Sequence, residues 1–518
     1  MAFVNFEIDR KVVPNWRPFQ ETSYLGELGF SYTPSNNYHY PIDEYINSWR
    51  ENRNILFASE LLSAAVSNDQ LNYSAIKDAA NYILQNRSNA NSAQIELAEV
   101  ILESPEIENV KIGIDKILEK LSQIQDIQIK IKQLKYEINK FPYNPILYVE
   151  IARNYIMLGQ KEKAILNMSI ALHLAPNNRY ITRSAVRMYI HLDDMERAHS
   201  VITSNSTFKY DPWLLAPEIS LKLMMNKSSN FVKQARNLLN QDVSPFYITE
   251  LASSLGTLEY YYGGKRKSRD LFCQSLIMPN DNSLAQAEWA FLKQIPIRIK
   301  RETVESVKCN HEAQSLYSYY VGDYNKALEE TVDWLLDAPF SEEATLRGSS
   351  IAYNFLNKYD IAARILNIGL KAHPGDPVFL NNLAYTLALD NKVDEAQKRM
   401  DELQRITKVD MNESISVCMK ATQGLIAYRK GNVEAGRRLY LEAIKDSKEL
   451  KEDREEYNWK AILNYLREEI RIAAGIPENV ITIIEGINEK PDMKEITKMK
   501  DDLKIMVINK KNLTEDSI

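Results

Sequence analysis

The sequence is poor in glycine, proline and cysteine: its 518 residues include 16 Gly, 18 Pro and 3 Cys. Together with a charged fraction of 26%, this composition is typical of a soluble and mostly helical chain. The cysteines, Cys273, Cys309 and Cys418, are far apart in the sequence and have no metal-ligand spacing. We therefore expect a reducing compartment and no bound metal.

The sequence also lacks the features of an exported or membrane protein. No apolar run reaches the roughly 18 residues that a membrane span needs. The first residues, MAFVNFEIDRK, place acidic and aromatic side chains where a signal peptide has a basic start and an apolar stretch. We expect a cytoplasmic protein with no membrane contact. The net charge of −6 gives no general attraction to nucleic acid, which is therefore the less favoured kind of partner.

Motifs of catalysis and cofactor binding are missing as well. The stretch GTLEYYYGGKRKS is similar to a phosphate-binding loop only superficially, because its glycine spacing and its last residue do not fit. His191 and His199 flank two aspartates, but a predicted turn separates them, so joint binding of one ion is not expected. We predict no catalytic residue, no cofactor and no enzyme. One alternative stays open, an enzymatic site that forms in space between Tyr24 and Glu103.

What the sequence does contain is a pattern of small and aromatic residues with a period of 34, clearest from Pro145 to Asn178 and from Glu343 to Asp410. Apolar residues recur there at intervals of three and four, which predicts two short helices with one apolar stripe each. Small side chains let the helix axes approach to roughly 8–10 Å, and a glycine closes the turn between them. In the first copy these positions are Tyr148, Ile151, Ala152, Tyr155, Gly159, Ala164, Met168, Ala171 and Pro176.

This pattern resembles the tetratricopeptide repeat, in which aromatic, small, glycine and proline residues stand at the same offsets. Two adjacent copies in one register carry the resemblance best, and weaker copies fill much of the remainder. The resemblance implies an all-α fold, a right-handed α-α superhelical solenoid of helix hairpins. The seven units that we assign begin at about residues 145, 179, 250, 308, 343, 377 and 416.

The remaining sequence suggests four regions along the chain. Residues 1–41 are rich in aromatic residues without helical periodicity and form an arm or a cap, 42–144 are helical, 145–450 form the solenoid, and 451–518 contain capping helices and a Lys-rich tail. Thr207–Asp242 and Ser283–Val307 depart from the repeat, and we expect the solenoid to be irregular there. Within the first of these stretches, Asp211 followed by Pro212 predicts a helix start.

The resemblance also implies a binding surface. The first helix of each tetratricopeptide repeat lines a concave groove, and its exposed positions select the partner. Carried onto this chain, these positions are Arg153, Met157, Arg183, Arg187, His191, Arg347, Asn354, Asn381 and Tyr385. Guanidinium groups at Arg153, Arg183 and Arg187 suit an acidic segment, but pairing with carboxylates of neighbouring helices is an equally good interpretation.

We therefore predict a protein-interaction scaffold or regulatory subunit whose groove binds an acidic or extended segment of another protein. The N-terminal arm is a second contact or a homo-oligomer element. The composition is rich in Tyr, Asn, Ile and Lys, which suggests a bacterium with an A/T-rich genome. By analogy, the protein would then be a subunit of a multi-protein system such as a defence system. The alternative is a nucleic-acid-binding helical repeat that uses the basic turn Lys265, Arg266, Lys267 and Arg269.

Overall fold

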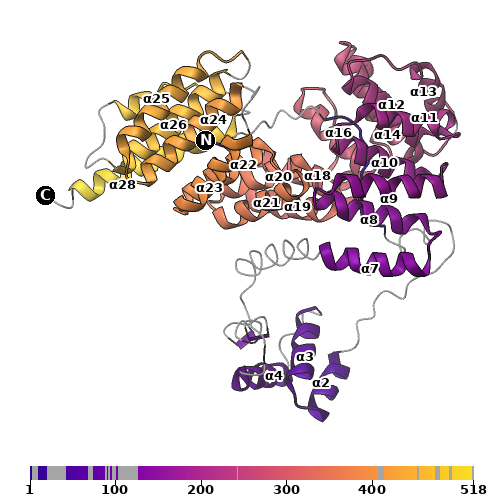
Figure 1. Ribbon diagram of the computed structural model, residues 1–518, viewed down its shortest axis with the longest axis horizontal. Helices are drawn as coiled ribbons and strands as arrows, with labels where there is room; N and C mark the ends of the chain where they lie inside the picture. The colour runs from indigo at the N-terminus through magenta and orange to yellow at the C-terminus, as the bar shows by residue number, and fades with distance from the viewer. Residues whose placement is uncertain are drawn as a thin grey trace. The chain divides into compact units, whose positions relative to one another are not determined.

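The structure is a computed structural model that describes residues 1–2, 10–19, 42–67, 74–87, 90, 94–95, 98, 101–102, 127–241, 243–406, 413–451, 454–472, 479–488 and 493–515. Regular structure in these residues is helical throughout, and they include no β-strand (Figure 1). The predicted all-α helical-repeat fold is thus confirmed. None of the helices in the described ranges is both long and apolar enough to cross a lipid bilayer.

The chain divides into two compact units, one comprising Phe19–Glu119 and the other Met1–Pro18 together with Lys120–Ile518. The described part of the smaller unit contains α2 (Ile42–Glu51), α3 (Ile55–Ser67) and α4 (Ser74–Gln85). These helices enclose a core of their own, in which Trp49, Leu61 and Ile83 are fully buried. Part of the range proposed for a hidden enzymatic site, Tyr24 to Glu103, lies outside the described residues.

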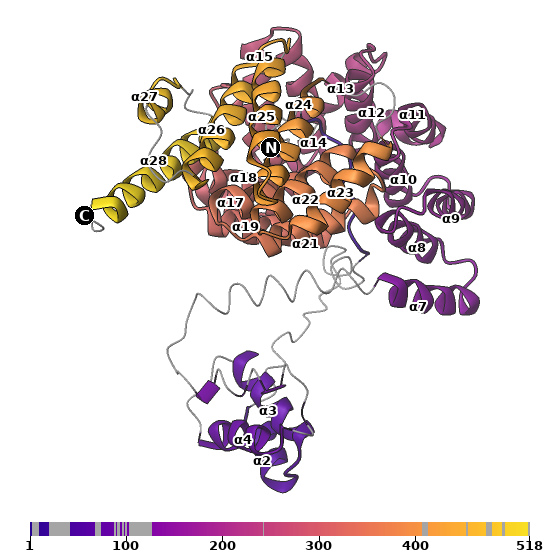
Figure 2. The same ribbon diagram turned by 60° about the vertical axis from the view of Figure 1, so that its left-hand side comes forward.

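The larger unit is a succession of helix hairpins, one at each of the seven predicted repeats (Figures 1 and 2). In the first two units and again in the last two, the first helices contact each other, and this contact buries part of the apolar stripe of each hairpin. The hairpins are α8 (Pro145–Met157) with α9 (Lys161–Leu174), α10 (Arg179–His191) with α11 (Met195–Ser204), α14 (Pro245–Tyr261) with α15 (Lys265–Ser275), α18 (His311–Val321) with α19 (Tyr324–Asp337), α20 (Glu342–Ser350) with α21 (Tyr359–Ala372), α22 (Pro377–Leu389) with α23 (Val393–Ile406), and α24 (Glu413–Arg429) with α25 (Val433–Ser447).

The clearest repeat folds as its sequence predicts. The Asn144 side chain accepts a hydrogen bond from the backbone of Ile146 and caps α8, and Pro145 occupies the first turn. Ala152 and Ala164 are completely buried where the two helices meet. Gly159 has a φ of +66°, and a β-carbon there would lie 2.5 Å from Cγ of Pro374. The turn of this hairpin therefore packs against the end of α21, far along the chain.

Two stretches depart from the hairpin pattern, as predicted. The first contains η3 (Phe208–Tyr210), α12 (Pro212–Met224) and α13 (Val232–Leu239), and Asp211 caps α12 as expected by accepting from the backbone of Trp213. The second contains α16 (Asp281–Leu292) and the short α17 (Arg301–Ser306). Asn280 and Ser283 cap each other's backbone at the start of α16.

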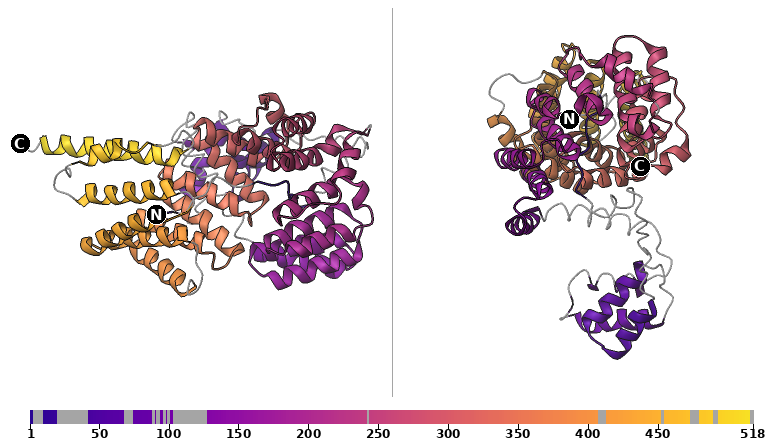
Figure 3. Two further views of the ribbon diagram at one scale, coloured as in Figure 1. Left: turned by 90° about the horizontal axis from the view of Figure 1, so that it is seen from above. Right: turned by 90° about the vertical axis from the view of Figure 1, so that its right-hand side faces the viewer.

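The ends of the larger unit are also helical. Helix α7 (Ile127–Lys140) packs against α8, and α26 (Arg454–Ile472), α27 (Val480–Glu485) and α28 (Lys494–Glu515) follow the last hairpin. The last helices, yellow in Figure 3, share an apolar core that includes Leu463, Ile484, Ile496 and Leu503. A π-helical segment, η4 (Ile351–Phe355), follows α20 and contacts α28. The C-terminal helices are therefore joined to the repeats through side-chain packing.

Candidate polypeptide-binding groove

The N-terminal segment, Arg10–Pro18, has no helix or strand and lies along the rest of the larger unit, although it is far from its contacts in the sequence. It contacts α8, α14, α16, α18 and the end of α19, and we call the surface formed by these helices the groove. Val12 and Trp16 of the segment are each only 1% exposed. The ring of Trp16 lies 5.5 Å from that of Phe340, centroid to centroid. The segment is thus part of the packed structure.

Arg10 uses its whole guanidinium group in the groove. Its Nε and Nη2 donate to the two carboxylate oxygens of Glu312 at 2.7 and 2.9 Å. Nη1 donates to Gln286 at 2.8 Å, and Nη2 also donates to Asn282 at 2.9 Å. Burial opposes the charged form of both ionic partners, but their mutual attraction outweighs it. The pKa of Arg10 is therefore raised and the pKa of Glu312 lowered.

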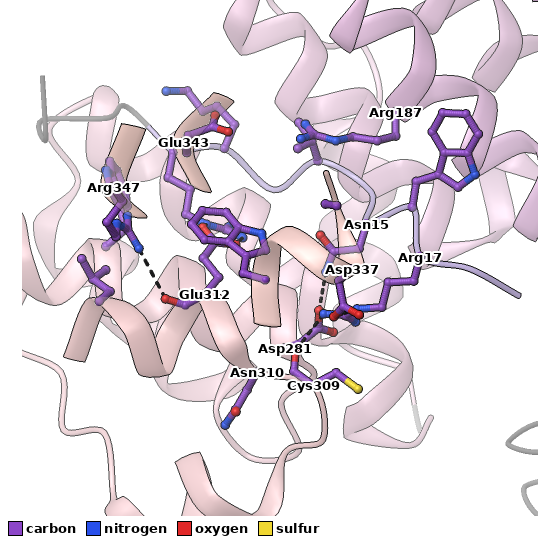
Figure 4. Close-up of a pocket in the computed structure, with 18 of the residues that line it drawn as sticks. Asn15, Arg17, Arg187, Asp281, Cys309, Asn310, Glu312, Asp337, Glu343 and Arg347 are labelled. Carbon is purple, nitrogen blue, oxygen red and sulfur yellow. Dashed lines mark hydrogen bonds and ion pairs between the residues drawn. The ribbon is translucent and has the colours of Figure 1, made fainter. Parts of the chain in front are cut away.

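Arg17 forms a second ionic contact at the other end of the segment. Its Nη1 lies 2.8 Å from the carboxylate of Asp281, and its Nε donates to Asp337 at 2.7 Å (Figure 4). Nη2 donates to the carbonyl oxygen of Cys309 at 2.7 Å. The side chain of Asn15 also donates to Asp281. Because burial dominates at Asp281, the pKa of its carboxyl group is raised even with Arg17 beside it.

The groove also binds the backbone of the N-terminal residues. Asn282 donates its side-chain amide to the carbonyl of Val13 and Gln286 donates to that of Arg10, both at 2.9 Å. The Nε of Arg153 donates to the carbonyl of Trp16 at 3.2 Å. These three bonds are independent of the side chains of the segment, and they hold the polypeptide by groups that every sequence has. Outside the groove, Asn381 of α22 donates to the carbonyl of Met1 at 2.8 Å.

A cavity of about 170 Å³ remains between the segment and the groove (Figure 4). Its wall includes Arg187 and Arg347, to which the sequence analysis assigned partner binding. Arg187 lies 5.8 Å from the centre of the Phe340 ring and, among the described residues, forms no hydrogen bond or ion pair. Arg347 donates to the carbonyl of Glu312 over 3.5 Å and lies above the ring of Trp334. Burial lowers the pKa of Arg347.

The other predicted groove residues of α8 and α10 already have partners within the chain. Arg153 is 4% exposed and also donates to the carbonyl of Asp337 and to the sulfur of Met157. Arg183 forms two hydrogen bonds of 2.9 Å with Glu250. For Arg183, this contact corresponds to the second of the two alternatives from the sequence analysis, pairing with a carboxylate of a neighbouring helix.

His191 occupies the contact between α10 and the end of α21. Its ring lies 4.6 Å from that of His373 and 5.6 Å from that of Phe340, centroid to centroid. Burial, together with the charges of His373 and Arg187, lowers the pKa of His191 to about 3. His191 is therefore neutral at physiological pH and serves packing between distant repeats in this arrangement.

Two predicted groove residues face the C-terminal helices. The side-chain amide of Asn354 donates to Glu495 at 2.9 Å, and Tyr385 donates to Asn464 at 2.8 Å. Arg467 donates to the oxygen of Tyr385 at 3.3 Å. The surface that the repeat pattern assigns to a partner is thus covered here by α26 and α28.

The basic turn has a different character. Lys265, Arg266 and Lys267 are exposed and, within the described part of the chain, have no hydrogen bond or ion pair through their side chains. Arg269 forms an ion pair of 2.7 Å with the adjacent Asp270. These residues begin α15 directly after the turn at Gly263, which has a φ of +79°. The turn thus lies at Gly263, and the residues that we predicted as a basic turn instead form the first turns of α15, where three of the cations face solvent.

A group of residues that the sequence separates meets near Arg17. Ligand-type atoms of Cys309, His311 and Asp337 lie within 4.8 Å of one another. Sequence spacing gave no sign of this group. Asp337 is paired with Arg17, and the Nδ1 of His311 lies 2.9 Å from Glu330. These ionic contacts account for the group as part of the Arg17 site.

Comparisons with known proteins add little to this description. No family model and no curated protein matches the sequence. Among solved structures, yeast Tom70 matches with 13% identity over 76% of this chain and 96% of that chain, at a TM-score of 0.29. The tetratricopeptide domain of P58(IPK) matches with 13% identity over 69% of this chain and 99% of that chain, at a TM-score of 0.17. At these TM-scores the functional argument rests on the geometry of the groove.

Proposed function

We propose that the protein is a non-enzymatic interaction scaffold whose groove binds an extended segment of a partner protein. The observation that supports this proposal is the set of three hydrogen bonds from Asn282, Gln286 and Arg153 to backbone carbonyls of the N-terminal segment. Side-chain amides and a guanidinium group that bind a backbone select an extended shape and tolerate many sequences. A groove of this kind suits recognition of a polypeptide.

The contacts give less support to the acidic partner that the arginines suggested. Arg183 is paired with Glu250, and Arg153 is buried and bonded to two carbonyl groups. Of the three arginines, only Arg187 has no hydrogen bond or ion pair with another described residue. One guanidinium group is a weak basis for selecting an acidic segment. The scaffold proposal therefore rests on backbone recognition, and membership of a bacterial defence system stays an analogy.

Affinity purification of the full-length protein from its native cells tests the scaffold proposal. We expect a stoichiometric protein partner that is lost when Asn282 and Gln286 are both changed to alanine. A matched control changes Lys265 and Lys267, which are exposed and have no side-chain hydrogen bond or ion pair with any described residue, and should retain the partner. Circular dichroism establishes that both variants keep their helices. A partner that binds the Asn282 and Gln286 variant equally well contradicts groove recognition.

The exposed basic turn supports a second candidate function, nucleic-acid binding. Lys265, Arg266 and Lys267 are adjacent, and Tyr262 before them is 67% exposed, so a phosphate backbone and a stacked base have suitable contacts. Such binding would weaken steeply with salt, because neutralised phosphates release counterions. Titration of a labelled single-stranded nucleic acid with the protein at several salt concentrations tests this candidate function. The control is the variant in which all three cations are changed to glutamine. Binding that the triple change leaves intact rules it out.

A further inference from the structure

The contacts of the N-terminal segment are of two chemical kinds. One kind binds backbone carbonyls and would accept many sequences. The other consists of carboxylates that receive guanidinium groups: Glu312 at one end, and Asp281 with Asp337 at the other. We call these the two carboxylate sites of the groove. They are occupied by arginines seven positions apart, which in an extended chain corresponds to about 23 Å.

The carboxylate sites make the groove selective for positive charge. The side chains of Glu312, Asp281 and Asp337 are only 20, 16 and 22% exposed. Removing the arginines would leave these carboxylates poorly hydrated and without their cationic partners, which is unfavourable in a partly buried site. An acidic occupant would add repulsion. Whatever fills the groove in place of the segment must therefore bring cations to the same two positions.

We propose that the N-terminal segment is an internal ligand of the groove, and that the partner which replaces it is an extended polypeptide with two arginines spaced as Arg10 and Arg17 are. This inference rests on the proposed scaffold function and adds the chemistry and the regulation of the same groove. Between its two arginines the partner should carry apolar residues, because Val12 and Trp16 of the N-terminal segment are buried at the corresponding positions.

The covalent attachment of the segment gives this arrangement a regulatory consequence. A tethered ligand rebinds within its own molecule, at an effective concentration set by its connection to the groove, so a partner in solution competes with it from a disadvantage. The apparent affinity of the partner is the intrinsic affinity multiplied by the fraction of molecules whose groove is open. Weakening the segment therefore increases partner affinity, whereas weakening the carboxylate sites decreases it.

A labelled peptide competition with the full-length protein tests this inference. The probe is a fluorescein-labelled peptide with the sequence of residues 10–18, RKVVPNWRP, and the control peptide has glutamine at both arginine positions. We compare the wild type with two variants. In one, Arg10→Gln and Arg17→Gln weaken the internal ligand; in the other, Glu312→Gln, Asp281→Asn and Asp337→Asn neutralise the carboxylate sites and leave side chains of similar size.

The expected results have opposite signs in the two variants. The peptide should bind the Arg10→Gln, Arg17→Gln variant at least tenfold more tightly than the wild type, and the control peptide at least tenfold more weakly than the arginine peptide. The variant with neutral carboxylate sites should not bind the arginine peptide measurably. Equal affinity of the wild type and the arginine variant, or equal affinity of the two peptides, would overturn the proposal.

A measurement on the unmutated protein covers the case in which a variant does not fold. Lys11 is 8% exposed and its ammonium group donates to Tyr261 at 2.9 Å. Saturating peptide should release the segment and raise the rate at which an amine-specific reagent acylates Lys11 of the chain by at least fivefold. An unchanged rate contradicts displacement. If a native partner requires Asn282 and Gln286 but is indifferent to Glu312 and Asp337, this inference fails while the scaffold function stands.

Discussion

The α8–α9 hairpin and the groove helices α16, α18 and α19 of the larger unit serve different tasks. In the hairpin α8–α9, small residues at fixed offsets are buried between helices, and they serve the approach of one helix to another. In the groove helices, carboxylates of α16, α18 and α19 face the N-terminal segment. The first region serves helix packing, and the second supplies the ionic contacts of the segment.

This division explains why binding residues are hard to find from a repeat pattern. The pattern records what helix packing requires, namely size and apolar character at a few positions. A salt bridge such as Arg10 with Glu312 has no such signature, because its partners are 302 residues apart. Substitutions in the two regions should therefore have different effects, one on the stability of the fold and the other on the occupancy of the groove.

The largest effect on stability is expected from Gly159→Ala in the α8–α9 hairpin. Gly159 has a φ of +66°, and a β-carbon would lie 2.5 Å from Pro374 and 2.7 Å from the carbonyl of Lys371. Left-handed strain and overpacking together should lower the free energy of unfolding by about 2–5 kcal/mol. Chemical denaturation measures the change. Gly263→Ala is the matched control, since its φ is +79° and nothing lies within 4 Å of its β-carbon.

Gly263→Ala should then cost about 1–2 kcal/mol, the backbone strain alone. Equal losses for the two glycines would contradict the packing of the α8–α9 turn against Pro374.

A smaller effect on stability, with a large effect on the segment, is expected from Glu312→Gln in α18. The change keeps the shape of the side chain but removes the charge that Arg10 meets at 2.7 and 2.9 Å. Loss of a charge-assisted pair should cost about 1.5–3 kcal/mol. Lys11 should become accessible to amine acylation while the helical circular dichroism stays unchanged. Global unfolding of this variant would mean that the segment is an obligatory part of the core.

As the pH is lowered, the contact of His191 should lose stability at a higher pH than the contact of Glu312 with the N-terminal segment. His191 packs between α10 and α21 with its pKa lowered to about 3. The unfolded chain takes up a proton below the ordinary histidine pKa of about 6.5 and the folded chain does not, so stability falls as the pH falls from about 6.5. Glu312 has a lowered pKa, so its contribution is present above the ordinary glutamate pKa of about 4.3 and is lost only below it.

Thermal unfolding followed between pH 7 and pH 3.5 checks this order. His191→Gln should remove part of the decline between pH 6.5 and pH 4.5, and protection of Lys11 should persist through that range. Release of the segment already at pH 6 would contradict the role given to Glu312.

The smallest effect is expected at the basic turn. Changing Lys265 and Lys267 to glutamine should alter the free energy of unfolding by less than about 0.5 kcal/mol, because both side chains are exposed and unpaired with any described residue. The same variant should keep Lys11 protected. A loss of stability beyond 1 kcal/mol would show that this turn contributes to packing.

The sequence allowed the fold to be predicted further than the site. The roles of Gly159, Ala152 and Ala164 follow from local geometry that a single repeat contains, and the start of α12 at Asp211 and Pro212 is equally local. Arg153 and Asn381 were assigned to the groove, and both bind the backbone of the N-terminal residues. Asn282 and Gln286 were not assigned, because the helix that contains them, α16, departs from the repeat pattern. Glu312 was not assigned either, although it lies in a predicted repeat.

The role of the N-terminal residues was only partly foreseen. Their lack of helical periodicity suggested an arm or a cap, and Arg10–Pro18 does lie over helices of the larger unit. The first of those contacts lies about 140 positions along the chain and the others nearer 300, so no local pattern could indicate them. The stretch 20–41, which completes the predicted arm, lies outside the described residues.

Amine acylation of the wild-type protein, read residue by residue with mass spectrometry, tests the central claim most directly. The claim is that the groove holds the N-terminal segment as an extended polypeptide. It predicts that Lys11, which is 8% exposed, reacts at least tenfold more slowly than the exposed Lys265 and Lys267 in the same molecule. Reaction of Lys11 at the rate of Lys265 and Lys267 would contradict the account, because the segment would then lie outside the groove in solution.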